Sequence, residues 1–177
     1  MKGQTIEIPS KGTRPTSVIL KRKFFDSLQG ESKFETFLDL CAGSGSVGIE
    51  ALSRGASSVT FVDKGKDQVQ LIKKNCRKLN VNFEKIQIVQ QDSLQWIKKN
   101  KASLQNGVWI YFDPPYKLEG LYLDFSKFVL SLDIDINVAI EANNRLPFFS
   151  EIEELLSSGV SKVYSQGDKS IIKYKNY

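Results

Sequence analysis

The sequence predicts a doubly wound α/β domain, in which helices cover both faces of a mostly parallel, seven-stranded sheet. Strand-like segments alternate with helical ones along most of the 177 residues, which is the pattern of repeated βαβ units. The segment 108–112 is apolar throughout, as expected of a strand that is covered on both faces. A glycine-rich stretch follows the first strand-like segment, where α/β sheets bind their ligands. We expect residues 34–177 to form this domain and residues 1–33 to form a basic N-terminal arm with one helix.

Seven segments have the length and the apolar content of strands. The last two are separated only by a turn around Gly167 and Asp168, so they should pair as an antiparallel hairpin at one edge of the sheet. The predicted strands are residues 36–41, 58–63, 86–90, 108–112, 137–141, 160–165 and 171–174.

Helices are predicted between these strands because apolar residues recur three or four positions apart. In residues 68–79 this spacing places Val69, Ile72, Cys76 and Leu79 on one face. The other helices predicted within the domain are residues 47–54, 93–99, 122–132 and 150–158.

A further helix is predicted over residues 18–28. Thr16 is a suitable N-cap, and Gly30 would end the helix. Its apolar stripe repeats every four residues and consists of Leu20, Phe24 and Leu28, with Phe25 beside them. Lys21 lies within this stripe by its helical angle, so its charge must reach solvent or meet an anionic partner.

The net charge of +5 is concentrated near the N-terminus. Residues 1–33 contain seven basic and three acidic residues, whereas the rest of the chain contains 18 and 17. A basic arm on a nearly neutral domain favours a polyanionic partner, because neutralised phosphates release their condensed counterions. A solvated tail that only keeps the protein in solution is the alternative.

The composition excludes several classes of function. Histidine is absent, which excludes a histidine base and histidine metal ligands. Cys41 and Cys76 form neither a CxxC pair nor a metal-ligand cluster. The longest apolar run, residues 108–112, is far shorter than the roughly 18 residues that a membrane span needs, and residues 1–10 lack the apolar core of a signal peptide. We therefore expect a soluble cytoplasmic protein without a metal site.

The glycine-rich stretch, residues 39–48, begins with an acidic residue at the end of the first strand. Its G-x-G-x-x-G spacing would suit a dinucleotide, but Asp39 before the glycines instead suits a cationic amino-acid group such as the ammonium of S-adenosylmethionine. Asp63, at the end of the second strand, would then accept hydrogen bonds from the ribose hydroxyls. Asp92, after the third, would meet the adenine amino group. The alternative for each aspartate is a helix cap or a turn.

A second motif, Asp113-Pro114-Pro115-Tyr116, directly follows the fourth strand. Proline fixes the backbone and supplies a carbonyl without an amide donor. The Asp113 carboxylate and the Pro114 carbonyl can therefore both accept hydrogen bonds from one exocyclic amine. Tyr116 can stack on the base that carries that amine. The alternative is a proline-rich turn in which Tyr116 only covers the core.

Together these motifs resemble a class I S-adenosylmethionine-dependent methyltransferase, and more narrowly the bacterial 16S ribosomal RNA guanine-N2 methyltransferase family (RsmD type). The resemblance covers essentially the whole chain. The residues that carry it are 14–16, 24–28, 38–56, 61–63, 91–92 and 112–116.

The resemblance implies S-adenosylmethionine as the cofactor and 16S ribosomal RNA as the substrate, within an assembling small ribosomal subunit, with the enzyme acting as a monomer. It implies catalytic roles for residues 113–116 and RNA contacts by Arg14, Lys21 and Arg22. The cofactor residues that it implies are Asp39, Cys41, Ala42, Gly43, Gly45, Asp63, Lys64, Asp92 and Ser93.

The sequence departs from the family pattern in the N-terminal helix. The family has a Val-Arg-Glu-like stretch where this chain has Leu20-Lys21-Arg22. The acidic residue is lost, and lysine is a poorer bidentate phosphate ligand than arginine.

Three other functions remain open from the residues alone. A DNA adenine-N6 methyltransferase would use the same Asp-Pro-Pro-Tyr chemistry, although the chain has no obvious segment for reading a DNA sequence. A nicotinamide-dependent oxidoreductase would explain Gly43, Gly45, Gly48 and Asp63 but not residues 113–116. A nucleic-acid-binding module without catalysis would not need the cofactor and acceptor motifs.

Overall fold

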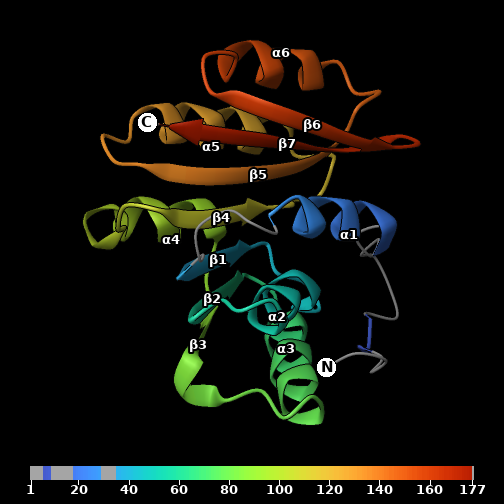
Figure 1. Ribbon diagram of the computed structural model, residues 1–177, viewed down its shortest axis with the longest axis vertical. Helices are drawn as coiled ribbons and strands as arrows, with labels where there is room; N and C mark the ends of the chain where they lie inside the picture. Colours follow the sequence, from blue (N-terminus) through green and yellow to red (C-terminus); the bar gives the residue numbers. More distant parts are fainter. Residues whose placement is uncertain (1–5, 9–17, 29–34, 177) are drawn as a thin grey trace.

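One seven-stranded sheet organises the computed structural model, which describes residues 6–8, 18–28 and 35–176. Its strand order is β3-β2-β1-β4-β5-β7-β6, and Figure 1 shows the strands stacked in this order. The first five strands run parallel, whereas β7 is antiparallel to both β5 and β6. The strands are β1 (Thr36–Leu40), β2 (Ser58–Asp63), β3 (Ile86–Gln90), β4 (Val108–Phe112), β5 (Ile136–Asn143), β6 (Val160–Gln166) and β7 (Lys169–Asn176).

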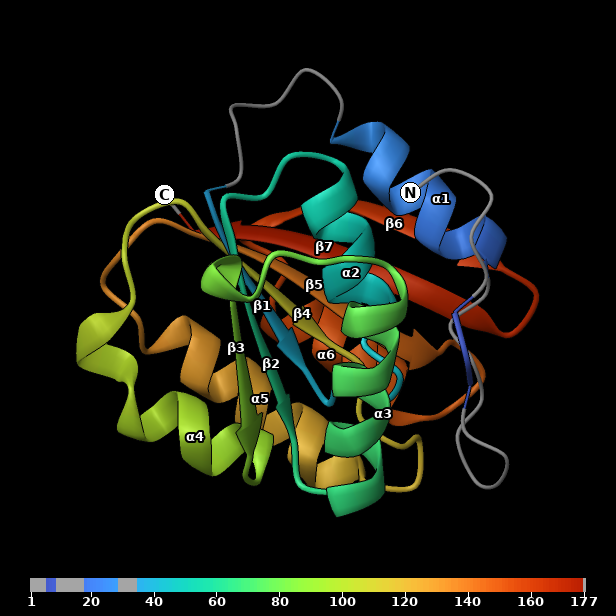
Figure 2. The ribbon, with the colours of Figure 1, turned by 90° about the horizontal axis from the view of Figure 1, so that it is seen from below.

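Three helices cover each face of this sheet, among the residues that the structure describes. The buried side chains of α1, α2 and α3 form one apolar cluster with one face of the sheet, and those of α4, α5 and α6 form a second cluster with the other. Figure 2 shows α2 and α3 on the side of the sheet opposite to α4 and α5. The helices are α1 (Val18–Ser27), α2 (Ser46–Ser53), α3 (Lys66–Lys78), α4 (Ser93–Lys99), α5 (Glu119–Leu130) and α6 (Phe148–Leu155).

The predicted α/β class and the antiparallel C-terminal hairpin are confirmed. Several helix ends differ from the prediction, because α5 begins at Glu119 and α3 at Lys66, three and two residues before the predicted positions, and α6 spans Phe148–Leu155 instead of 150–158. The first two residues of α3 and of α5 are exposed and carry no large apolar side chain, so the apolar spacing gave no sign of them. The predicted cap Thr16 and the predicted stop Gly30 lie outside the described residues.

The first strand was predicted to include Cys41, and this was wrong. Strand β1 ends at Leu40, because Cys41 has a φ of 64°, which turns the chain out of the sheet. The apolar character of Cys41 had extended the strand pattern by one residue.

Helix α1 packs on β4 and on the C-terminal hairpin. The Phe24 ring lies 5.7 Å from that of Trp109, 5.6 Å from that of Tyr111 and 6.4 Å from that of Tyr164, all edge-on. The Tyr164 hydroxyl donates a hydrogen bond to Ser27 Oγ at 2.6 Å. The apolar stripe predicted for this helix is therefore part of the core.

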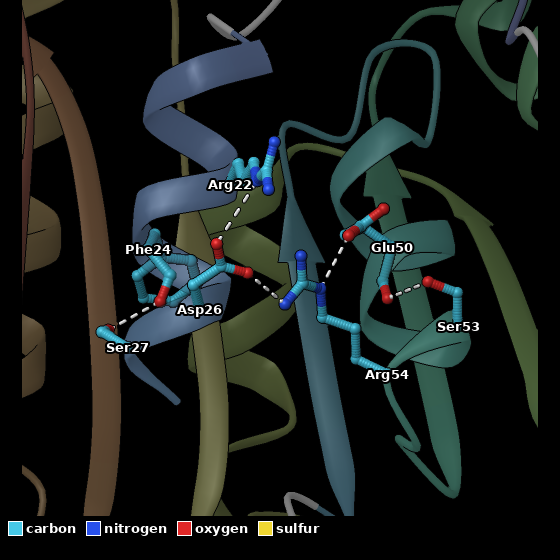
Figure 3. A network of polar contacts seen from close by, with 7 residues as sticks. All are labelled: Arg22, Phe24, Asp26, Ser27, Glu50, Ser53 and Arg54. Atoms are coloured by element: carbon cyan, nitrogen blue, oxygen red, sulfur yellow. Dashed lines mark hydrogen bonds and ion pairs between the residues drawn. The ribbon is translucent and has the colours of Figure 1, made fainter. Parts of the chain in front are cut away.

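A polar network joins α1 to α2 on the outer side of these helices (Figure 3). The Arg54 guanidinium bonds Asp26 Oδ1 through Nη1 and Glu50 Oε1 through Nε, each at 2.7 Å. Arg22 Nε lies 3.4 Å from Asp26 Oδ2. The Arg54 guanidinium also lies over the Phe25 ring, 5.5 Å from its centroid. These contacts fix α1 beside α2.

Among the residues that the structure describes, no helix has both the length and the apolar character needed to cross a membrane.

Candidate functional site

A cavity of about 560 Å³ opens at the carboxyl ends of β1, β2, β3 and β4, where ligands bind in sheets of this topology. It brings together the predicted motifs from four strand ends and also includes residues that the sequence did not indicate. Its lining residues are Ile8, Asp39, Cys41, Ala42, Gly43, Ser44, Ser46, Val47, Asp63, Lys64, Gly65, Gln68, Asp92, Ser93 and 113–118, together with Leu121.

Aspartates hold the glycine-rich turn in place. Asp39 Oδ2 accepts a hydrogen bond from the Gly48 amide at 2.8 Å. Asp63 accepts two, from the Gly43 amide at 2.9 Å and from the Gly65 amide at 2.8 Å. The turn therefore lies between two aspartate side chains that also line the cavity.

Gly45 was predicted to bind the cofactor, yet this residue of the described chain is not among the lining residues. It precedes α2 with a φ of 77°. A Cβ at this position would lie 3.3 Å from the Ile72 side chain. The glycine allows a left-handed turn in close contact with α3.

Asp39 is almost fully buried, and burial raises the pKa of its carboxyl to about 8. The hydrogen bond from Gly48 opposes this shift, and the nearby Asp63 charge adds to it. A carboxyl with this pKa is mostly protonated at neutral pH. A cation placed beside it would favour the charged form, so the site is suited to a positively charged group.

The third aspartate predicted to bind the cofactor, Asp92, has a structural partner as well as a place in the cavity wall. Its Oδ1 accepts a hydrogen bond from the Gln95 amide at 3.0 Å and so caps α4. The next residue, Ser93, accepts a hydrogen bond from the Cys41 amide at 3.1 Å. Asp92 thus caps α4 and also lines the cavity.

The Cys41 side chain contacts Ser93 Oγ through its sulfur at 3.4 Å. Burial raises the pKa of the Cys41 thiol to about 12. The group therefore stays a neutral thiol at physiological pH, which does not suit a nucleophile.

The loop 113–116 continues directly from β4. The Asp113 amide donates to the Leu40 carbonyl at 3.4 Å, which keeps the start of the loop next to β1. The Pro114 carbonyl accepts a hydrogen bond from the Tyr122 hydroxyl at 2.8 Å, and the Glu141 carbonyl oxygen lies 3.1 Å from the same hydroxyl. Tyr122 is fully buried in α5. Tyr122 thus holds the loop in position, although in the sequence it shows only the pattern of a buried aromatic residue.

The residues predicted to contact RNA lie in different surroundings. Lys21 Nζ donates to the Ser46 carbonyl at 3.3 Å, beside the cavity, and burial lowers the pKa of its ammonium. Arg22 points outward, with 78% of its side chain exposed. Arg14 lies outside the described residues.

Comparisons with known proteins show which proteins this chain is similar to. A family model described as "Conserved hypothetical protein 95" matches residues 1–168. Ribosomal RNA small subunit methyltransferase D of Haemophilus influenzae is 36% identical over 107 residues, which are 60% of this chain and 55% of that protein. Putative rRNA methyltransferase YlbH of Bacillus subtilis is 33% identical over 124 residues, 68% of this chain and 65% of that protein. The chain thus aligns with about half to two thirds of the length of these curated relatives.

Solved structures show the same fold. Putative methyltransferase yhhF from Escherichia coli matches with a TM-score of 0.74 at 20% identity, over 98% of this chain and 92% of that one. A structure titled as SMU.776, a putative methyltransferase complexed with SAH, also has a TM-score of 0.74, at 15% identity, over 89% of this chain and 50% of that one.

Proposed function

We propose, since this chain belongs to the Conserved hypothetical protein 95 family, that it is an S-adenosylmethionine-dependent methyltransferase that modifies the exocyclic N2 of a guanine in 16S ribosomal RNA. The observation that carries the proposal is the single cavity that joins Asp39, Asp63 and Asp92 to the loop 113–116. The ribosomal RNA methyltransferase names of its relatives support RNA as the substrate. We further propose that the enzyme acts as a monomer on 16S RNA within an assembling small subunit.

The cavity residues fit the proposed cofactor. Asp39 is a buried acid that a cation would stabilise in its charged form, as the methionine ammonium requires. Asp63 is half-buried at the end of β2, where a carboxylate can accept from ribose hydroxyls. Asp92 and Ser93 line the wall where the adenine would lie. When bound, S-adenosylmethionine supplies a methyl group that the amine nitrogen accepts as the carbon–sulfur bond breaks.

Residues 113–116 act on the amine that receives the methyl group. The lone pair of a guanine amine is delocalised into the ring, so the nitrogen is a weak nucleophile. Hydrogen bonds from this amine to the Asp113 carboxylate and the Pro114 carbonyl orient its lone pair, and the Asp113 carboxylate stabilises the positive charge that develops on nitrogen. Asp113 then accepts the proton that the nitrogen releases, and Tyr116 stacks on the base.

Tyr122 keeps the Pro114 carbonyl at a fixed position in this reaction. Its hydroxyl donates to that oxygen at 2.8 Å from a fully buried ring, so it acts as a positioning residue. A target base within folded RNA must leave its stack to reach the loop.

The most direct test is a mass-spectrometric map of methylated nucleosides from cells with and without the gene. We expect one N2-methylguanosine to disappear from 16S ribosomal RNA in the deletion strain and to return with the plasmid-borne gene. Loss of N6-methyladenine from DNA, with an unchanged RNA map, would favour the alternative activity that shares the Asp-Pro-Pro-Tyr motif.

The basic N-terminal residues should contribute to RNA affinity. Replacing Arg14, Lys21 and Arg22 together by alanine is expected to weaken binding of a 16S fragment and to lower the slope of log affinity against log salt by about two to three, because about one counterion is released for each phosphate contact. Filter binding between about 50 and 200 mM salt measures the slope. An unchanged slope would mean that these residues are only solvated. The matched control is a triple variant in which Lys98, Lys99 and Lys101 are replaced by alanine.

Cofactor affinity should depend on pH through Asp39. We expect the affinity for S-adenosylhomocysteine to rise as the pH increases from about 6 to about 8, by up to about tenfold per unit, because the ligand ammonium favours the carboxylate whereas burial keeps the free carboxyl protonated below about pH 8. Titration calorimetry should also detect the proton released on binding. Asp39→Asn should bind weakly with little pH dependence, and a flat wild-type profile would contradict the role of Asp39.

A further inference from the structure

The short segment Ile6–Ile8 lies against α3 and the glycine-rich turn. Ile6 packs on the apolar cluster beneath α1, α2 and α3. Ile8 is 57% exposed, and it forms part of the cavity wall. A piece of chain that precedes the domain thus reaches the cavity.

One buried side chain holds this segment. Asn75, in α3, is fully buried. Its Oδ1 accepts from the Glu7 amide at 3.0 Å, and its Nδ2 donates to the Glu7 carbonyl at 2.9 Å. The carboxamide therefore pairs with both polar groups of one residue, as a neighbouring strand would.

The same Asn75 amide also reaches the cofactor turn, because Nδ2 donates to the Ser44 carbonyl at 2.9 Å. Ser44 lies between Gly43 and Gly45 and lines the cavity. Both amide hydrogens of Asn75 are thus used, one for the segment and one for the turn. If either backbone moved away, a buried polar group would lose its partner.

Ion pairs add to this attachment at the surface. Glu7 lies 2.7 Å from Lys74 Nζ and 3.9 Å from Lys78 Nζ. The hydrogen bond from Lys74 lowers the pKa of the Glu7 carboxyl. These exposed pairs contribute little stability, so Asn75 and the apolar contact of the partly buried Ile6 are the main attachments.

We infer that Ile6–Ile8 forms part of the cofactor site. Asn75 is the positioning residue that holds this segment and the glycine-rich turn together around the bound cofactor. The inference rests on the proposed function for the identity of that cofactor. Because Asn75 contacts both backbones, cofactor binding and docking of the segment stabilise each other to the same extent.

Calorimetry and amide hydrogen exchange on the full chain test this inference. Asn75→Leu, which keeps the branching at Cγ but removes all three bonds, should raise the Kd for S-adenosylhomocysteine by about tenfold, within the range of typical coupling energies. Ile8→Ala changes an exposed residue and is expected to raise that Kd by about threefold through lost apolar contact. Leu130→Ala is the control, since Leu130 is 40% exposed at the end of α5 and does not line the cavity.

Hydrogen exchange at the Glu7 amide gives a second readout. Exchange should be slowed when S-adenosylhomocysteine binds the wild type and should be fast in Asn75→Leu. Wild-type binding together with unchanged affinities in both variants would overturn the inference and leave the proposed function intact. A wild type that bound no S-adenosylhomocysteine would overturn the proposed function and the cofactor part of the inference. In that case, equal exchange rates of the Glu7 amide in the wild type and in Asn75→Leu would also exclude the attachment of the segment by Asn75.

Discussion

Replacing Asp113 by alanine is expected to lower the rate of methyl transfer by about 10³-fold while cofactor affinity stays within about tenfold. The reason is that the Asp113 carboxylate acts on the amine and on the charge that develops there, and groups that stabilise developing charge are commonly worth 10²- to 10³-fold in rate. The aspartate sits on a loop fixed to β1 through the Leu40 carbonyl and to α5 through Tyr122. Its removal should therefore leave the loop in place.

Single-turnover transfer of a labelled methyl group to a 16S fragment measures this effect, with calorimetry for the cofactor. Asp113→Asn keeps the shape and one acceptor oxygen, so it should retain more activity than alanine. Asp133→Ala, an exposed residue outside the cavity, is the control for a lost carboxylate. Wild-type activity in Asp113→Ala would remove the catalytic assignment.

Adding one methyl group at Gly48 should be the most destabilising of these substitutions. A Cβ there would lie 2.8 Å from Val59 Cγ1 and nearer still to Phe61 Cε1, both in β2 and both buried. Gly48 lies in α2, and its amide bonds Asp39. Neither neighbour can move without displacing the sheet, so Gly48→Ala should lower the free energy of unfolding by about 2–3 kcal/mol.

Gly120→Ala is the matched control for this change. Gly120 is also helical, in α5, but a Cβ there meets nothing within 4 Å. Alanine is the better helix former, so this variant should be neutral or more stable by about 0.5–1 kcal/mol. Urea unfolding of both variants checks the contrast, and equal effects would contradict the close packing of α2 on β2.

The cavity could be outlined from the sequence because its aspartates lie at the carboxyl ends of successive strands. Parallel strands end at one edge of a sheet, so Asp39, Asp63, Asp92 and Asp113 had to lie near one another once the βαβ pattern was recognised. The strand ends were also predictable, since β2, β3 and β4 begin and end at the predicted residues. Residues whose position follows from the order of strands are thus predictable from one sequence.

Residues whose position depends on tertiary contacts were not predictable. Tyr122 and Asn75 look like ordinary helix residues in the sequence, and their partners are backbone groups 8 and 68 positions away. Gly45 fits the glycine pattern of a ligand site, and the structure adds a contact that the pattern does not show, because a Cβ there would lie 3.3 Å from Ile72 of α3. No local pattern distinguishes a glycine that faces a ligand from one that faces a side chain.

The packing of α1 on β6 has a consequence for the order of folding. Ser27 and Tyr164 are 137 positions apart but share a hydrogen bond, so the contacts of α1 with β6 form only after the hairpin has been synthesised. Until then Phe24 can pack on β4 but lacks its Tyr164 contact, which leaves the kind of apolar surface that chaperones bind. Contacts of such long sequence separation also slow the closing steps of folding. The early helix and the late hairpin together therefore make synthesis of the hairpin a condition for completing this domain.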